Sequence, residues 1–131
     1  MNEASRSATA PAEPGWLQSL FRAIDARDAA GFAAFLTPGA SFRFGNAAPI
    51  VGREAVQAAV HGFFQAIGGC RHRVLQHWQD GPALAVQGEV TYTRLDRREV
   101  TVPFVNVFRL RGALIDEYLI YIDNAPLFAP G

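Results

Sequence analysis

The chain has 131 residues, of which 50% are hydrophobic and 18% charged, and twelve basic residues balance twelve acidic ones. This length fits one domain with a single core, and the composition excludes intrinsic disorder for most of the chain. The balanced charge predicts no nucleic-acid partner, and no apolar run reaches the roughly 18 residues of a membrane span. Every basic residue is arginine, which excludes a lysine Schiff base, and the single cysteine, Cys70, excludes an internal disulfide.

The chain begins with small, polar and proline-bearing residues. We therefore expect residues 1–14 to form a flexible arm and residues 15–131 to form a single domain. The start lacks the apolar segment of a secretory signal, so we expect a cytoplasmic protein. Apolar residues at helical spacing predict helices over residues 16–26 and 53–67, and a shorter one from an N-cap at Asp28 to about residue 36.

The remaining segments have the composition of β-strands. Residues 41–44 alternate in polarity and predict a short strand. Four longer β-branched and aromatic segments follow the last helix, over residues 71–79, 83–95, 98–110 and 114–123, with turn residues between them. Three helices ahead of an antiparallel meander predict an α+β domain in which the helices cover one face of the sheet.

The turns predict which residues share a sheet face. We place two-residue turns at Asp80–Gly81 and Asp96–Arg97, and a three-residue turn at residues 111–113. This register gives two rows on one face: Val74, Gln87, Asn106 and Tyr118, then His72, Glu89, Phe104 and Ile120. The other face would carry Leu84, Val86, Val90, Tyr92, Val105, Val107, Leu119 and Tyr121. Because the helices cover only one face, we expect a homodimer packed through this outer apolar face.

Glu89 is the leading catalytic candidate, because a carboxylate inside an apolar pocket is placed to act as a general acid or base. His72 lies beside it in this register, and Glu89 would orient its ring toward a substrate. The alternative is a structural hydrogen bond between the two side chains. The three scattered histidines lack metal-ligand spacing and no cofactor-binding motif is present, so we expect neither a metal nor a cofactor.

The same predicted face supplies the candidate ligand contacts. Gln87, Asn106 and Tyr118 form a polar row that would hold a carbonyl or hydroxyl group, or else an internal hydrogen-bond network. The expected apolar contacts are Phe42, Phe44, Phe104 and Ile120. Such residues more often belong to a core than to a ligand site.

Several strings are typical of one superfamily. They are FRAIDARD at residues 21–28, FLTPGASF at 35–42, VGREAV at 51–56, NVFRLRGALI at 106–115 and YLIYID at 118–123. Over about residues 16–125 the chain resembles the SnoaL-like, ketosteroid-isomerase-like superfamily with its nuclear transport factor 2-like fold, nearest the limonene epoxide hydrolase branch. The resemblance implies a cone-shaped α+β barrel of helices on a curved, mainly antiparallel sheet, with a deep pocket and commonly a homodimer. In a cone-shaped fold the core is also the pocket wall, so the apolar contacts would belong to both.

The catalytic sets implied by the resemblance do not carry over intact. The places of an epoxide hydrolase's Asp–Arg–Asp set hold Glu89, Gln87 and Ile120, and phenylalanines stand where a Tyr and an Asn would help to position water. The base of a ketosteroid isomerase would fall near Phe44. We therefore expect a pocket for a small hydrophobic, oxygen-bearing molecule, with cofactor-free isomerase, cyclase or hydrolase chemistry through Glu89. The alternative is a non-catalytic, homodimeric ligand-binding domain.

Overall fold

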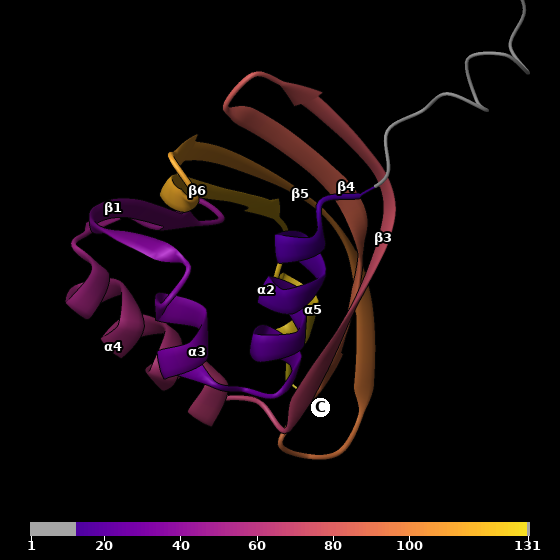
Figure 1. Ribbon diagram of the computed structural model, residues 1–131. Coiled ribbons are helices and arrows are strands. Elements are labelled where there is room, and N and C mark those ends of the chain that lie inside the picture. Colours follow the sequence, from indigo (N-terminus) through magenta and orange to yellow (C-terminus); the bar gives the residue numbers. More distant parts are fainter. Residues whose placement is uncertain (1–12, 131) are drawn as a thin grey trace, which may run out of the picture.

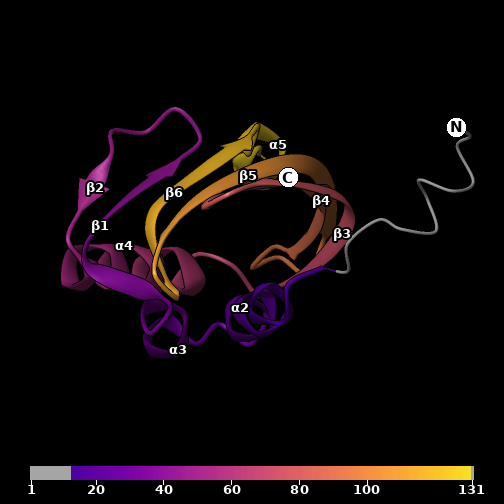
Figure 2. The same cartoon turned by 45° about the horizontal axis from the view of Figure 1, so that its top comes forward.

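Helices pack on the concave side of one curved sheet in the computed structural model, which describes residues 13–130 (Figures 1 and 2). The sheet has six strands in the order β2-β1-β6-β5-β4-β3 and is not closed, since β2 and β3 form its edges. In chain order the elements are α2 (Gly15–Asp25), α3 (Ala29–Ala33), β1 (Leu36–Phe44), β2 (Ile50–Val51), α4 (Arg53–Gln65), β3 (Gly69–Asp80), β4 (Ala83–Thr93), β5 (Glu99–Arg111), β6 (Leu114–Ile122) and α5 (Ala125–Phe128). The predicted α+β fold is confirmed, and the predicted arm falls almost wholly outside the described residues.

The helices form where the apolar spacing predicts them. Leu17, Leu20 and Phe21 recur on one face of α2 and are buried against the sheet. Asp28 caps α3 as predicted, because its carboxylate accepts the N–H of Gly31 at 2.9 Å. No helix within residues 13–130 is long and apolar enough to cross a membrane.

The first strand is longer than the sequence predicts. It begins at Leu36 rather than at Ser41 and pairs in parallel with β6, with an irregularity between these two residues. The helix predicted to reach residue 36 therefore ends at Ala33. The short elements β2 and α5 were not predicted.

The hairpin between β4 and β5 differs from the predicted two-residue turn. Its loop contains Leu95, Asp96 and Arg97, and Arg97 has a φ of 72°, the left-handed conformation that closes a three-residue loop. The N–H of Arg94 donates to the carbonyl oxygen of Arg98 across this loop. The extra residue shifts the register by one, so every β4 side chain lies on the face opposite to the predicted one.

This shift overturns the predicted position of two candidate site residues. Glu89 lies opposite Pro103 and Gln87 opposite Val105, and both side chains lie on the outer, convex face. The prediction that Glu89 and Gln87 face the interior is wrong. The four β4 residues predicted on the outer face are instead buried in the core: Leu84, Val86, Val90 and Tyr92.

A bulge in β3 restores the predicted face of His72. The pairing of β3 with β4 shifts between Val74 and Gln76, and His72 comes to lie opposite Val90. Because one inserted residue reverses the faces a second time, His72 shares the concave face with Phe104, as predicted.

The pairing of β5 with β6 keeps the predicted faces. Asn106 lies opposite Ile120, and Phe108 lies opposite Tyr118. This register differs by two residues from the predicted one, and a shift of two leaves each side chain on its face. Asn106, Tyr118 and Ile120 therefore lie on the concave face beneath the helices.

We expect Gly88→Ala to destabilise the protein by about 1–3 kcal/mol. A Cβ at this position would collide with the backbone carbonyl oxygen of Arg73 and lie 2.9 Å from Cζ of Phe104. Urea unfolding followed by circular dichroism measures the difference. Gly62→Ala on α4 is the matched control, because its Cβ meets nothing within 4 Å and alanine favours a helix. Equal stability of Gly88→Ala and the wild type would contradict the β3–β4 register.

Candidate functional site

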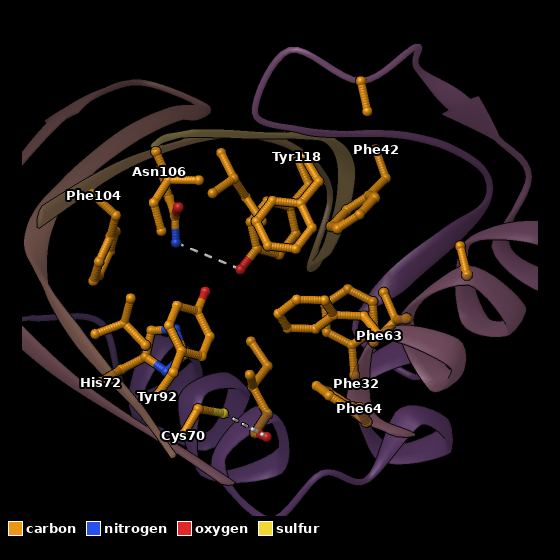
Figure 3. A pocket seen from close by; sticks show the side chains of 18 of the residues that line it. Phe32, Phe42, Phe63, Phe64, Cys70, His72, Tyr92, Phe104, Asn106 and Tyr118 are labelled. Atoms are coloured by element: carbon orange, nitrogen blue, oxygen red, sulfur yellow. Dashed lines mark hydrogen bonds between the residues drawn. The ribbon is translucent and has the colours of Figure 1, made fainter. Parts of the chain in front are cut away.

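A cavity of about 240 Å³ lies between the concave face of the sheet and the helices (Figure 3). No acidic residue and no arginine is among the residues that line it. Its polar groups belong to Cys70, His72, Tyr92, Asn106 and Tyr118. Six phenylalanines form much of the wall: Phe32, Phe42, Phe44, Phe63, Phe64 and Phe104. The space is thus a mainly aromatic chamber with few polar groups.

His72 is held by a carboxylate from a different element than predicted. Nδ1 of His72 lies 2.6 Å from Oδ1 of Asp25, the last residue of α2, and the backbone N–H of His72 donates to Oδ2 at 3.0 Å. A carboxylate only accepts hydrogen bonds, so Nδ1 carries a proton, and Nε2 is an acceptor whenever the ring is neutral. The predicted partner, Glu89, has no contact with this ring.

Two aromatic rings fix the plane of the imidazole. Phe21 stacks on His72 with centroids 4.7 Å apart and an interplanar angle of 15°, and Phe104 meets it edge-on at 5.5 Å. The His72 side chain is only 11% exposed. Within residues 13–130 no side chain or backbone group hydrogen-bonds to Nε2, and His72 is one of the residues that line the cavity.

Cys70 lies near the same carboxylate oxygen as His72. Its Sγ is 3.7 Å from Oδ1 of Asp25 and 3.6 Å from the carbonyl oxygen of Ile24. Burial, reinforced by the charge of Asp25, raises the pKa of the thiol to about 12. Cys70 is therefore a neutral, weak hydrogen-bond donor and a poor nucleophile.

Asp25, Cys70 and His72 are also the group within residues 13–130 whose donor atoms lie close enough together to hold a metal ion. Two ligands of one tetrahedral zinc ion lie roughly 3.4 Å apart when each bond is about 2.1 Å. The 2.6 Å between Asp25 and His72 is shorter and is typical of a charge-assisted hydrogen bond. The arrangement favours a proton-transfer pair, and we propose no metal site.

A second polar group faces the cavity from β5 and β6. Nδ2 of Asn106 lies 3.5 Å from the phenol oxygen of Tyr118, as the dashed line in Figure 3 marks, and both residues are buried. Burial raises the pKa of Tyr118 and of Tyr92 well above the ordinary value of a phenol, so both are neutral donors. Because Asn106 donates to the Tyr118 oxygen, the Tyr118 proton is free to bond to an oxygen atom of a bound molecule.

The structure brings together most of the predicted site residues. Seven line the cavity: Phe42, Phe44, His72, Phe104, Asn106, Tyr118 and Ile120. Gln87 and Glu89 do not, and Glu89 is 44% exposed with an oxygen 3.9 Å from Arg73. Sequence reasoning missed Asp25. Its one signal was a carboxylate at the C-terminal end of a helix, where the helix dipole disfavours negative charge.

We expect stability to fall as the pH rises from 9 to 12. Cys70, Tyr92 and Tyr118 have raised pKa values in the folded state and ionise first in the unfolded state, above about 9 for the thiol and 10 for the phenols. Each group then lowers the free energy of unfolding by about 1.4 kcal/mol per pH unit. Urea titrations at several pH values measure this slope.

Cys70→Ala is the control for that slope, because it removes the only one of the three groups whose pKa in the unfolded state lies near 9. The variant should lose less stability than the wild type between pH 9 and 10. Equal slopes for the two proteins in this interval would show that the thiol ionises as easily when folded as when unfolded.

Comparisons with known proteins agree with this fold. The family model described as SnoaL-like domain matches residues 17–118. No curated protein matches the chain. An NTF2-like protein of unknown function from Burkholderia pseudomallei is 20% identical with a TM-score of 0.76, over 85% of this chain and 90% of that one.

Two further solved structures share the fold at lower identity. A putative polyketide cyclase from Xanthomonas campestris is 15% identical with a TM-score of 0.75, over 86% of this chain and 90% of that one. An LEH-like epoxide hydrolase from M. tuberculosis is 15% identical with a TM-score of 0.72, over 86% of this chain and 83% of that one. The structural matches establish the fold, and the family model covers most of the chain. The chain therefore belongs to the SnoaL-like domain family.

Proposed function

We propose that the protein is a cofactor-independent enzyme that moves a proton on a small, uncharged, oxygen-bearing molecule. The hydrogen-bonded pair of Asp25 and His72 at the wall of the apolar cavity is the observation that carries this proposal. Nε2 of His72 acts as the general base or acid. Asp25 keeps the ring in the required tautomer and compensates the positive charge that the ring gains with the proton.

Tyr118 supplies the second half of the chemistry. The Tyr118 hydroxyl can donate a hydrogen bond to a carbonyl oxygen of the bound molecule. This hydrogen bond stabilises the negative charge that develops on the oxygen when a neighbouring C–H is deprotonated. Asn106 donates to the Tyr118 oxygen and fixes its direction. This division of roles suits isomerisation, cyclisation or hydration through an enolate-like state.

The ligand is expected to be neutral and largely apolar. A charged group inside the cavity would have no counter-ion among the lining side chains unless it bound a protonated His72, and an unpaired buried charge costs several kcal/mol. Aromatic walls favour a flat ring system. The structures similar to this chain include a putative polyketide cyclase and an epoxide hydrolase, which is consistent with a ligand of this kind.

We expect the wild type to accelerate exchange of the α-hydrogens of a neutral bicyclic ketone, such as tetralone, with solvent deuterium. His72→Gln should lower the exchange rate about a hundredfold or more, because it removes the base. Asp25→Asn should lower it at least about tenfold, because an amide can stabilise the other tautomer of His72. Proton NMR in deuterated buffer follows the loss of signal.

Two matched variants control for loss of a charge or of a histidine. Glu89→Gln removes a carboxylate from the outer face of the sheet, and His61→Gln removes a histidine from the exposed side of α4. Neither substitution should change the exchange rate by more than about twofold. If the wild type binds tetralone without accelerating exchange, the protein is a binding domain and the catalytic proposal is wrong.

We also propose that the protein forms a homodimer through the outer face of the sheet. The helices lie on the concave face, and the convex face carries the 59% exposed Tyr121 beside partly exposed Val105, Val107 and Leu119. An apolar face of this kind on a stable protein favours burial against a second copy. Val86 does not belong to this face, since it is buried in the core.

Replacing Val107 with Arg should convert the dimer to a monomer, because a dimer interface would bury the guanidinium without a counter-charge. Light scattering at micromolar concentration measures the mass. Thr101→Arg is the control, since this exposed position on the same strand lies nearer the end of the sheet. A monomeric wild type under these conditions would refute the dimer.

A further inference from the structure

A second hollow adjoins the cavity at one end. It shares four wall residues with the cavity: Phe44, Ala47, Phe63 and Ile122. Its remaining wall comes from the loop after β1 and from the segment around α5, with Asn46, Asp123, Asn124 and Phe128. The two spaces are therefore neighbours separated by side chains that belong to both.

Two of the four shared residues are aromatic, and their rings are in contact. Phe44 on β1 and Phe63 on α4 meet edge to face, with centroids 4.9 Å apart and an interplanar angle of 76°. Phe63 also meets Tyr92 at 5.9 Å on the inner side and Phe128 at 6.5 Å on the outer side. Phe44 and Phe63 are each only partly buried, as rings at the mouth of a cavity would be.

The outer walls are held in place by hydrogen bonds. Arg43 donates to the carbonyl oxygen of Ala47 at 3.0 Å and fixes the loop after β1. Arg94 donates to the carbonyl oxygen of Pro126 at 3.2 Å, and Asp123 accepts the N–H of Ala125 at 3.0 Å, which together fix α5. The outer hollow is thus built by defined contacts on both of its sides.

The chemistry of the two spaces is complementary. The inner cavity is mainly aromatic, whereas the outer hollow adds two asparagines and the carboxylate of Asp123 to the exposed ring of Phe128. The amide and carboxylate oxygens accept hydrogen bonds, so the outer hollow suits a group that carries a hydroxyl. A molecule that fills both spaces has an apolar ring at one end and a hydroxyl at the other.

We propose that Phe44 and Phe63 form a partition that sets the length of the accepted molecule, and that the outer hollow is a second subsite for the hydroxyl-bearing end of a longer one. The inference rests on the inner cavity as the ligand site of the proposed function, but it does not depend on catalysis. In the wild type the paired rings restrict a long neutral aromatic molecule. Removal of the Phe63 ring joins the two spaces.

Binding of three neutral phenols tests the partition: naphthol, para-phenylphenol, and a biphenol with a hydroxyl at each end. Isothermal titration calorimetry gives the affinity of each for the wild type, Phe63→Ala and the milder Phe63→Leu. We expect the affinity of the biphenol relative to naphthol to rise at least about fivefold in both variants. The biphenol should gain more than para-phenylphenol, because only its second hydroxyl reaches the acceptors of the outer hollow.

Two further variants separate the partition from a general loosening of the core. Phe35→Ala removes a partly buried ring that lines neither space, and its relative affinities should stay within about twofold of the wild type. Adding Asp123→Ala, which removes the acceptor, and Phe128→Ala to Phe63→Leu should reverse the gain for the biphenol. Circular dichroism establishes that each variant is folded.

Unchanged relative affinities in folded Phe63→Leu would overturn the partition. Equal gains for para-phenylphenol and the biphenol would overturn the hydroxyl subsite. Failure of the wild type to bind naphthol would overturn the inner cavity as a site for neutral aromatics. None of these results depends on proton exchange, so a catalytically inactive protein with the expected selectivity would support the partition and contradict only the enzymatic role.

Discussion

The hydrogen bond between Asp25 and His72 is the contact on which the candidate site depends. Its partners are 47 residues apart, at the end of α2 and near the start of β3, so the bond forms only when the helix docks on the concave face. The same carboxylate also accepts the backbone N–H of His72. It therefore joins the helix to the edge strand and orients the imidazole at once. The packing of α2 on the sheet and the orientation of Nε2 consequently depend on the same hydrogen bonds.

The burial of the cavity's polar groups explains why they are neutral. Burial raises the pKa values of Cys70, Tyr92 and Tyr118, so these groups line the cavity as uncharged hydrogen-bond donors. A proton taken up by His72 instead creates a charge beside Asp25, where the carboxylate compensates it. Within the described residues, His72 is therefore the cavity-lining group whose positive charge a carboxylate would compensate. An uncharged hydrogen-bonding group, Tyr118, lines the same cavity from β6.

Much of the fold could be predicted from the sequence, because helical spacing and β-rich segments are local signals. The faces of β4 could not, because they depend on whether one turn has two residues or three. Arg97 adopts a positive φ without being glycine or asparagine, so the sequence carries no clear mark of the longer loop. The sequence does not indicate the bulge in β3 either. The predicted face of His72 is correct only because these two shifts cancel. Only the first shift affects Glu89, so its predicted face is wrong.

Asp25 and Glu89 carry the same chemical group but have different partners. Glu89 lies in an apolar strand, yet it faces solvent near Arg73, where an ion pair contributes only about 0–1 kcal/mol. Asp25 ends a helix, where the dipole disfavours a negative charge by about 0.3–1 kcal/mol at an exposed site. Two hydrogen bonds from His72 offset that cost in the folded protein. Apolar neighbours in the sequence, as around Glu89, are therefore a weaker sign of a site than a position at the C-terminal end of a helix, as for Asp25. A carboxylate at that end is disfavoured by the helix dipole and requires a compensating partner elsewhere in the fold.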